Sequence, residues 1–209
     1  MTDAPDALLV EVADTETTGF PPGARLVEIG AVRIDLASGV EVARFSTLID
    51  PGIPIPRGAW RVHHISRAMV RGAPDAARAL ADFWAWHAAG LPLWFHHARF
   101  DRDVLAAECA RTGVCPPARI DLHCTRNLAR LARPGLASYA IAALIGPFGL
   151  GIESETHRAL DDSRLAARLL AACRAAGTPP HCPCGAIGPG PGPAVAPDPA
   201  ANAEALHGA

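Results

Sequence analysis

Two acidic residues stand two positions apart at the end of a predicted β-strand. Asp14 and Glu16 close the apolar segment Leu8–Glu16. Because side chains two apart on a strand share one face, both carboxylates point to the same place. Crowded carboxylates repel each other unless a cation neutralises them, and oxygen ligands of this kind suit magnesium or manganese. Taken alone, such a pair is more often simply part of a solvated turn.

Two further groups of polar residues each open a predicted helix. The first is His97-Ala98-Arg99-Phe100-Asp101, and the second is His157-Arg158-Ala159-Leu160-Asp161-Asp162. Asp101 fits either a metal site or an ordinary helix start, where an acid caps the helix or complements its dipole. Helical spacing alone pairs His157 with Asp161, four residues on.

Together the three groups resemble the DnaQ-like exonucleases of the DEDDh type, the family of the proofreading subunit of bacterial DNA polymerase III. Its motifs are matched by Asp14-Thr15-Glu16-Thr17-Thr18-Gly19, by Ala98-Arg99-Phe100-Asp101, and by His157, Ala159 and Asp162 in the form H-x-A-x-x-D. Arg25–Gly30 resembles the second strand of the family, and Val62-His63 followed by Ile65 resembles its V-H-G-I segment. The order and spacing match over roughly residues 7–175.

The resemblance implies hydrolysis of a terminal phosphodiester with two magnesium ions, for which manganese is a substitute. Asp14, Glu16 and Asp162 would hold one ion, and Asp14 would bridge to a second that Asp101 also ligates. His157, on a loop before the last helix, would be the general base, because imidazole titrates near neutrality. The fourth acid is thus Asp162 rather than Asp161.

The resemblance also implies a site for the terminal nucleotide and a set of partners. The residues that would line this site are Thr17, Thr18, Gly19, Phe20 and His63. The partners would be single-stranded or frayed 3' ends of nucleic acid, with 5'-mononucleotides as products, and a DNA polymerase as an optional second partner. Three positions depart from the family pattern: His97 replaces the usual Asn, His64 the usual Gly, and Gly58 an acid that contacts substrate in the polymerase subunit.

The activity expected from this resemblance is a 3'→5' exonuclease with DNA as the favoured substrate, in replication proofreading or DNA repair. An exoribonuclease that trims RNA 3' ends is the alternative, because discrimination by the 2'-hydroxyl depends on contacts that the sequence does not place. A non-catalytic module that binds nucleic acid or a polymerase is an alternative of another class. Retention of all five predicted site residues argues against it.

The elements that must position these residues follow from apolar periodicity. Three strands with short links favour an antiparallel meander: Leu8–Glu16, Leu26–Asp35 and Val40–Asp50. An irregular connection is predicted at Pro51–Gly58. The predicted helices are Asp75–Ala89, Phe100–Thr112, Thr125–Ala132, Ser138–Phe148 and Arg158–Ala176, and the later strands are Leu91–His96 and Arg119–Leu122. This order favours an α/β fold, and the resemblance implies a ribonuclease H-like mixed five-stranded sheet flanked by helices.

The composition of the 209 residues is that of a soluble globular chain, with 50% hydrophobic and 19% charged residues. No apolar run reaches the roughly 18 residues of a membrane span, and the polar N-terminus does not resemble a signal peptide. The predicted location is therefore the cytoplasm, with no membrane partner. A formal net charge of −2 gives no overall basic field toward nucleic acid. Residues 1–176 form the predicted exonuclease domain, and residues 177–209 a disordered tail rich in Pro, Gly and Ala.

The histidines and cysteines suggest two other metal sites. His63, His64, His96 and His97 could bind a transition metal. His181, Cys182 and Cys184 offer three ligands in the tail, where a zinc site normally needs four at structured spacings. The cysteines of a cytosolic chain are otherwise expected as free thiols. Trp84, Trp86 and Trp94 are expected to fill the core rather than stack on bases.

Overall fold

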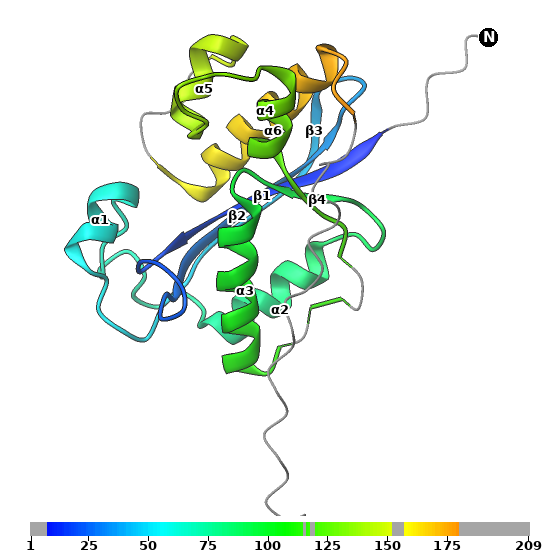
Figure 1. Ribbon diagram of the computed structural model, residues 1–209. Helices are drawn as coiled ribbons and strands as arrows, with labels where there is room; N and C mark the ends of the chain where they lie inside the picture. Colours follow the sequence, from blue (N-terminus) through cyan, green and yellow to red (C-terminus); the bar gives the residue numbers. More distant parts are fainter. Residues whose placement is uncertain (1–7, 115, 118–119, 152–156, 180–209) are drawn as a thin grey trace, which may run out of the picture.

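A mixed sheet with helices on both faces forms the centre of the molecule (Figure 1). The computed structural model describes residues 8–114, 116–117, 120–151 and 157–179. The strands are β1 (Leu9–Thr17), β2 (Leu26–Asp35), β3 (Val40–Leu48), β4 (Leu93–Phe95) and β5 (Leu122–Cys124). The helices are α1 (Arg57–His63), α2 (Ala76–Trp86), α3 (Ala98–Thr112), α4 (Thr125–Ala132), α5 (Ile141–Phe148) and α6 (Ala159–Ala175). The predicted five-stranded sheet flanked by helices is confirmed.

The sheet has the order β3-β2-β1-β4-β5, so β1 is its central strand. β1, β2 and β3 form the predicted antiparallel meander. β4 pairs parallel to β1, and β5 pairs parallel to β4. Strands that begin antiparallel and continue in parallel make the sheet mixed, as expected.

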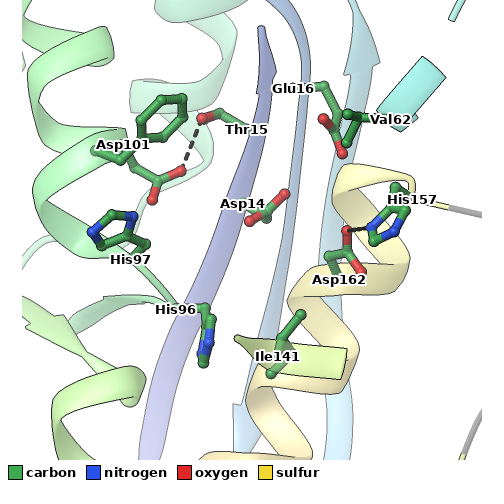
Figure 2. Close-up of a pocket in the computed structure, with 11 residues that line it drawn as sticks. Asp14, Thr15, Glu16, Val62, His96, His97, Asp101, Ile141, His157 and Asp162 are labelled. Atoms are coloured by element: carbon green, nitrogen blue, oxygen red, sulfur yellow. Dashed lines mark hydrogen bonds and ion pairs between the residues drawn. The ribbon is translucent and has the colours of Figure 1, made fainter. Parts of the chain in front are cut away.

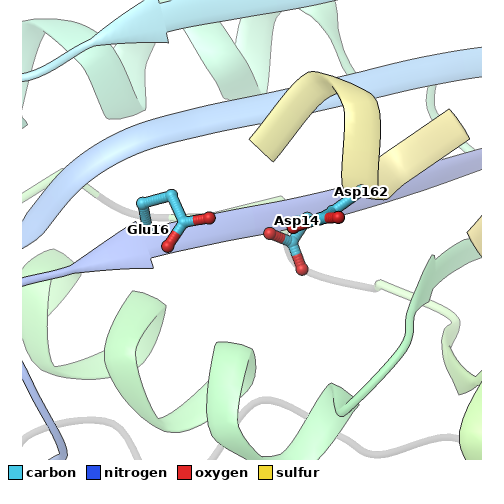
Figure 3. A group of neighbouring side chains, drawn as sticks. All are labelled: Asp14, Glu16 and Asp162. Carbon is cyan, nitrogen blue, oxygen red and sulfur yellow. The ribbon is translucent and has the colours of Figure 1, made fainter. Parts of the chain in front are cut away.

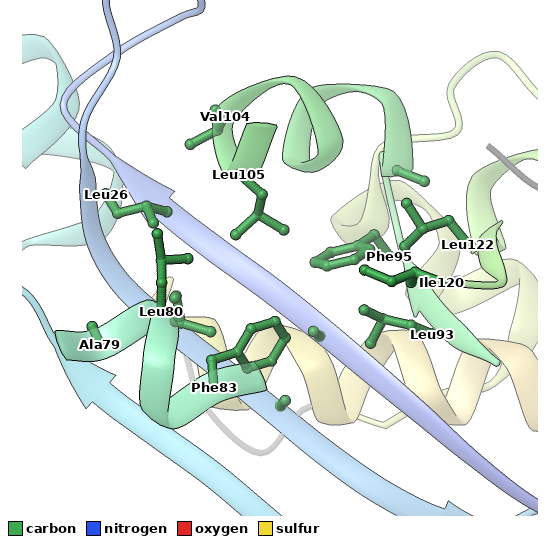
Figure 4. Close-up of a cluster of buried hydrophobic side chains, with 14 of the residues drawn as sticks. Leu26, Ala79, Leu80, Phe83, Leu93, Phe95, Val104, Leu105, Ile120 and Leu122 are labelled. Carbon is green, nitrogen blue, oxygen red and sulfur yellow. The ribbon is translucent and has the colours of Figure 1, made fainter. Parts of the chain in front are cut away.

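Apolar side chains of β1 alternate between two cores, one on each face of the sheet. Ala13 belongs to the core under α2 and α3, which is built around Phe83 and Phe95 (Figure 4). Val10 and Val12 belong to the core under α4, α5 and α6. By the same alternation, the even-numbered residues beyond Val12 continue along the face that α6 covers.

The start of α6 packs directly onto the backbone of β2. A Cβ atom at Gly30 would lie 2.1 Å from the backbone nitrogen of Leu160, so only glycine fits there. The Ser163 hydroxyl donates a hydrogen bond to the carbonyl oxygen of Gly30 at 2.8 Å. These contacts fix where α6 begins above the sheet.

The structure differs from the sequence-based prediction at several elements. α1 was not predicted, because three prolines precede it and its seven residues carry no clear apolar period. The last strand is Leu122–Cys124 instead of Arg119–Leu122, since pairing with β4 sets its position. α5 begins at Ile141 rather than Ser138. Most other boundaries agree within about two residues, which is the usual spread between ways of defining an element end.

Other expectations concern the side chains of the interior. Trp94 is buried, and Trp84 and Trp86 pack against the core, so the tryptophans fill the interior as predicted. Cys124 and Cys173 are free thiols. None of the helices in the described part of the chain is long and apolar enough to cross a membrane.

Candidate active site

Three carboxylates from two elements meet above the central strand (Figure 3). Asp14 and Glu16 come from β1, and Asp162 comes from the first turn of α6. One ligand oxygen from each lies within 4.8 Å of those of the other two. Asp161 lies elsewhere, with its Oδ1 atom 3.6 Å from a guanidinium nitrogen of Arg164. The structure therefore brings Asp162, and not its neighbour, to the two acids of β1.

Asp101 and His157 complete the predicted set around one pocket (Figure 2). Asp101 lies in the first turn of α3 and is 2% exposed, while its Oδ1 accepts a hydrogen bond of 2.8 Å from the hydroxyl of Thr15. His157 precedes α6, and its Nδ1 lies 3.5 Å from Oδ2 of Asp162. All five predicted residues line this pocket. The sequence analysis did not assign Thr15 a role in the site. The available signal was strand alternation, which turns Thr15 away from Asp14 and Glu16 and toward Asp101.

The carboxyl groups of this pocket hold their protons more tightly than usual. Burial raises the pKa of Asp101 to about 7. Burial and the nearby Asp162 raise the pKa of Glu16 to about 8. Burial, followed by the charges of Asp101 and Glu16, raises the pKa of Asp14 well above its usual range. Several oxygen donors that cannot all carry charge unaided fit a divalent cation of the magnesium or manganese class.

A buried ion pair anchors the chain beside His157. Glu28 of β2 is 1% exposed and accepts hydrogen bonds from the Nε atom of Arg158 at 3.0 Å and 3.1 Å. The same carboxylate accepts a bond of 3.0 Å from the backbone N–H of Ala159, the first residue of α6. Glu28 thus caps this helix and holds the residue that follows His157. Sequence reasoning did not single out this pair, although an acid inside an apolar strand was the available signal.

A second pocket adjoins the first and contains the residues predicted to bind the terminal nucleotide. Its predicted lining residues are all present, namely Thr17, Thr18, Gly19, Phe20 and His63. The opposite wall comes from α1 and the residue before it, with Pro56, Gly58, Ala59 and Val62. The two pockets share Thr15, Glu16, Val62 and Phe100. The unpredicted helix α1 therefore forms one side of the candidate substrate site.

The three departures from the family pattern all lie at or beside these pockets. His97 stacks on Phe100 with ring centroids 6.3 Å apart. His64 caps α1 in a left-handed conformation with φ of 57°, which explains why glycine is usual there. Gly58 has no atom within 4 Å of where its Cβ would be, so the nucleotide pocket is open at this point.

The structure does not support a transition-metal site made of histidines. Both ring nitrogens of His96 are engaged, by the Thr125 hydroxyl at 3.0 Å and the Tyr139 carbonyl at 2.9 Å. Nδ1 of His63 accepts a hydrogen bond from the backbone of Ile65. Among described residues, Asp14, Glu16 and Asp162 form the one cluster of at least three ligands close enough to hold an ion. The tail ligands His181, Cys182 and Cys184 lie outside the described residues.

Comparison with known proteins places this geometry in a family. The family model described as Exonuclease (RNase_T) matches residues 12–170, which include all five predicted site residues. The chain belongs to this exonuclease family. The predicted kinship with DnaQ-like exonucleases is therefore confirmed.

Particular relatives agree with the family assignment. The DNA polymerase III subunit epsilon of Treponema pallidum is 36% identical over 159 residues, covering 75% of this chain and 72% of the relative. A solved exonuclease X in complex with 5' overhanging duplex DNA is 29% identical with a TM-score of 0.65, covering 79% of this chain and 91% of that one. The nuclease domain of 3'hExo, a DEDDh family member bound to rAMP, shares the fold with a TM-score of 0.73 at 16% identity, over 83% and 95% of the two chains.

The relatives differ in length from the exonuclease chain. A Mycobacterium tuberculosis relative named for both exonuclease and endonuclease functions is 37% identical over 163 residues. The chain covers 73% of its own length in that match but spans only 24% of the relative. The shared region is thus the exonuclease domain, and activities of the larger protein do not carry over from this match.

Proposed function

We propose that the protein is a 3'→5' exonuclease that hydrolyses the terminal phosphodiester of nucleic acid, with DNA favoured, and releases 5'-mononucleotides. The observation that carries the proposal is the meeting of Asp14, Glu16 and Asp162 within 4.8 Å beside His157 and Asp101. A solved relative in complex with DNA, at 29% identity, supports DNA as the substrate. Replication proofreading or DNA repair is the proposed setting, and the cytoplasm stays the predicted location.

The oxygen donors of the pocket fit the cations that the activity would need. Asp14, Glu16 and Asp162 would hold one magnesium ion, and Asp14 with Asp101 would hold a second, with manganese as a substitute. When bound, such ions stabilise the attacking and leaving oxygens of an in-line displacement. His157 would accept the proton of the attacking water on a ring nitrogen.

The second pocket would bind the 3'-terminal nucleoside. Its walls are largely apolar, with Phe20 and Phe100 edge to face at a centroid distance of 6.0 Å. Apolar and aromatic surfaces accept any base, because each base has a flat face. This arrangement would bring the scissile phosphate, on the 5' side of the terminal nucleoside, to Glu16, which both pockets share.

A degradation assay tests the proposed function. Purified protein with magnesium is incubated with 5'-labelled single-stranded DNA, mismatched duplex DNA and short RNA of matched sequence. We expect stepwise shortening from the 3' end, fastest on DNA, with mononucleotide products and no activity in chelator. Equal activity of Asp14→Ala, or shortening that needs no divalent metal, would refute the proposal, while faster loss of RNA would replace DNA by RNA as substrate.

A DNA polymerase is a second partner that we propose on the name of the Treponema relative, which is a subunit of DNA polymerase III. Co-purification of the chain with the replicative polymerase of its source organism tests this partnership. Separate elution of the two proteins at micromolar concentration would contradict it.

A further inference from the structure

The pocket of acids extends beyond the point where a terminal nucleoside would sit. In Figure 2, Glu16 and Val62 lie above Asp14, toward the pocket of Thr17–Phe20. His96 and Ile141 lie below Asp14, at the end that the nucleotide pocket does not share. If the nucleoside occupies the upper end, as the proposed function holds, then the rest of the strand leaves at the lower end.

Three arginines lie near His96 and His97, two of the residues that line the pocket. Arg99 lies in the first turn of α3, two residues after the rim residue His97. Arg126 and Arg130 lie four residues apart on α4 and therefore on one face of that helix. The backbone N–H of Arg126 donates to the His96 carbonyl at 3.2 Å, so α4 begins against the rim of the pocket.

The charges of these arginines reach the rim of the pocket. Burial lowers the pKa of His97, and the positive charges of Arg126, Arg130 and Arg99 lower it further. Arg126 and Arg130 act on His96 in the same way, after the larger effect of burial. Positive charges therefore act on both rim histidines of a pocket that four acids also line.

No acid neutralises the three arginines among the residues that the structure describes. None of them takes part in an ion pair there, whereas the arginines that do pair with acids are Arg33, Arg44, Arg78, Arg102, Arg111, Arg158 and Arg164. Arg130 is held without loss of charge, because Asn127 accepts its hydrogen bond at 2.9 Å and its guanidinium lies 5.2 Å over the ring of Tyr139.

Stabilisation of the helices by their dipoles does not explain why Arg99 and Arg126 stand where they do. The N-terminus of a helix carries a partial positive charge, so cations in the first turn are unfavourable. Arg99 and Arg126 both occupy first turns, of α3 and α4 respectively. Arg130 in the last turn of α4 does complement the dipole, but its two companions do not. Two charges that oppose their own helices at one rim indicate a ligand of opposite charge.

We propose that Arg99, Arg126 and Arg130 form an arginine track that binds the backbone phosphates of the strand upstream of the terminal nucleotide. Guanidinium groups match phosphate oxygens in a bidentate geometry, and contacts to phosphates fix the position of a strand without reading its sequence. Such a track would supply local positive charge for binding a nucleic acid to a chain whose formal net charge is −2. It rests on the proposed function for the nature of the ligand and for the direction in which the strand runs.

Equilibrium binding without turnover tests the track. Fluorescence anisotropy of a 5'-labelled single-stranded DNA of about twelve nucleotides is measured in calcium, over a range of salt concentrations. The variant Arg99→Gln/Arg130→Gln changes two exposed residues and keeps the half-buried Arg126. We expect at least about tenfold weaker binding at low salt, and a salt slope reduced by about 1.4, since each phosphate contact on a single strand contributes roughly 0.7.

The matched control is Arg44→Gln/Arg78→Gln, which removes the same charge from two exposed arginines outside the pocket. Equal weakening in both double variants, or no weakening in the first, would overturn the track. The single variants Arg99→Gln and Arg130→Gln give the same comparison should the double variant fold poorly.

Hydrolysis of the p-nitrophenyl ester of thymidine 5'-monophosphate separates this inference from the proposed function. This ester carries the terminal nucleoside and its phosphate but no upstream strand. The track predicts that Arg99→Gln/Arg130→Gln cleaves it at the rate of the unaltered protein while binding DNA weakly. No cleavage by the unaltered protein would count against the proposed function alone, whereas an equal loss on ester and DNA in the variant would count against the track.

Discussion

Asp161 and Asp162 are adjacent in sequence, yet the structure gives them different surroundings. Successive residues of a helix are rotated by about 100°, so two neighbours cannot share one face. Asp162 faces Asp14 and Glu16, and burial raises the pKa of its carboxyl. Asp161 faces Arg164 one turn further along the helix. The same residue type therefore serves two purposes within a single peptide unit.

The adjacent pair gives a matched test of the metal site. Asp162→Asn removes one donor from the cluster, and we expect activity to fall by more than the roughly 100-fold typical for loss of an outer partner of a metal ligand. Asp161→Asn removes the same charge from the same turn and should change activity by less than about twofold, because Arg164 keeps Glu41 as a partner at 2.9 Å. Rates on single-stranded DNA and magnesium titrations of both variants measure this. A larger loss in Asp161→Asn would restore the pairing that helical spacing alone suggests.

At the scale of elements, three contacts join the start of α6 to β2. Glu28 caps the helix and binds Arg158, Gly30 lets the two backbones touch, and Ser163 bonds to the carbonyl of Gly30. All three lie within two turns of His157. Polar contacts with β2 thus fix the start of the helix that supplies Asp162 and follows His157, while further along this helix packs on β1 as well.

This anchor predicts that Glu28 is a positioning residue for His157. Glu28→Gln keeps an acceptor for the N–H of Ala159 but loses the charge that holds Arg158. We expect kcat to fall on the order of tenfold, with little change in KM, because the nucleotide pocket stays in place. Steady-state kinetics on the p-nitrophenyl ester measure the two constants separately.

Arg164→Gln is the control for the anchor, since Arg164 pairs with Glu41 and so joins the same helix to the sheet, away from His157. A purely structural role for Glu28 would lower the melting temperature of both variants and leave kcat unchanged. That outcome, or a rise in KM alone, would contradict the positioning role.

Elements with strong local signals were predictable from sequence, and elements fixed by tertiary contacts were not. The meander of β1 to β3 follows from alternating apolar residues and short turns. α1 has seven residues and β5 has three, which is too short for a reliable apolar periodicity. Their positions depend on the elements that they pack against or pair with. In the same way, motif order predicted the acids that line the pocket, whereas the Thr15–Asp101 and Glu28–Arg158 contacts span 86 and 130 residues and leave no local pattern.

At the scale of the whole molecule, the crowded acids that suit the pocket to a cation should also lower the stability of the metal-free protein. The unfolded chain ionises Glu16 and Asp101 near their ordinary pKa values, whereas the folded chain raises them to about 8 and about 7. At any pH between the ordinary pKa and the raised pKa of such a group, the folded state binds more protons than the unfolded state. Stability without metal therefore falls as pH rises through this range.

Other titrating groups leave a clean window in which to see this effect. Burial lowers the pKa of His63, and that of His96 to about 4, so these two add stability only as pH rises toward about 6.5. The carboxyl of Glu11 has a lowered pKa and loses its contribution only in acid, as pH falls through its folded value. Between pH 7 and pH 8 the pocket acids thus dominate the expected change.

We expect the metal-free protein to lose at least about 1 kcal/mol of unfolding free energy from pH 7 to pH 8, since one pKa unit corresponds to about 1.4 kcal/mol. Saturating magnesium should remove this loss, because the cation neutralises the same oxygens and its binding releases protons. Urea unfolding at the two pH values, with magnesium or with chelator, measures the four free energies. Glu16→Gln serves as the control, because it removes a carboxyl whose pKa is raised to about 8 and should flatten the metal-free dependence. A metal-free protein equally stable at both pH values, or a magnesium effect that does not grow with pH, would mean that the carboxylates do not compete for charge as their crowding implies.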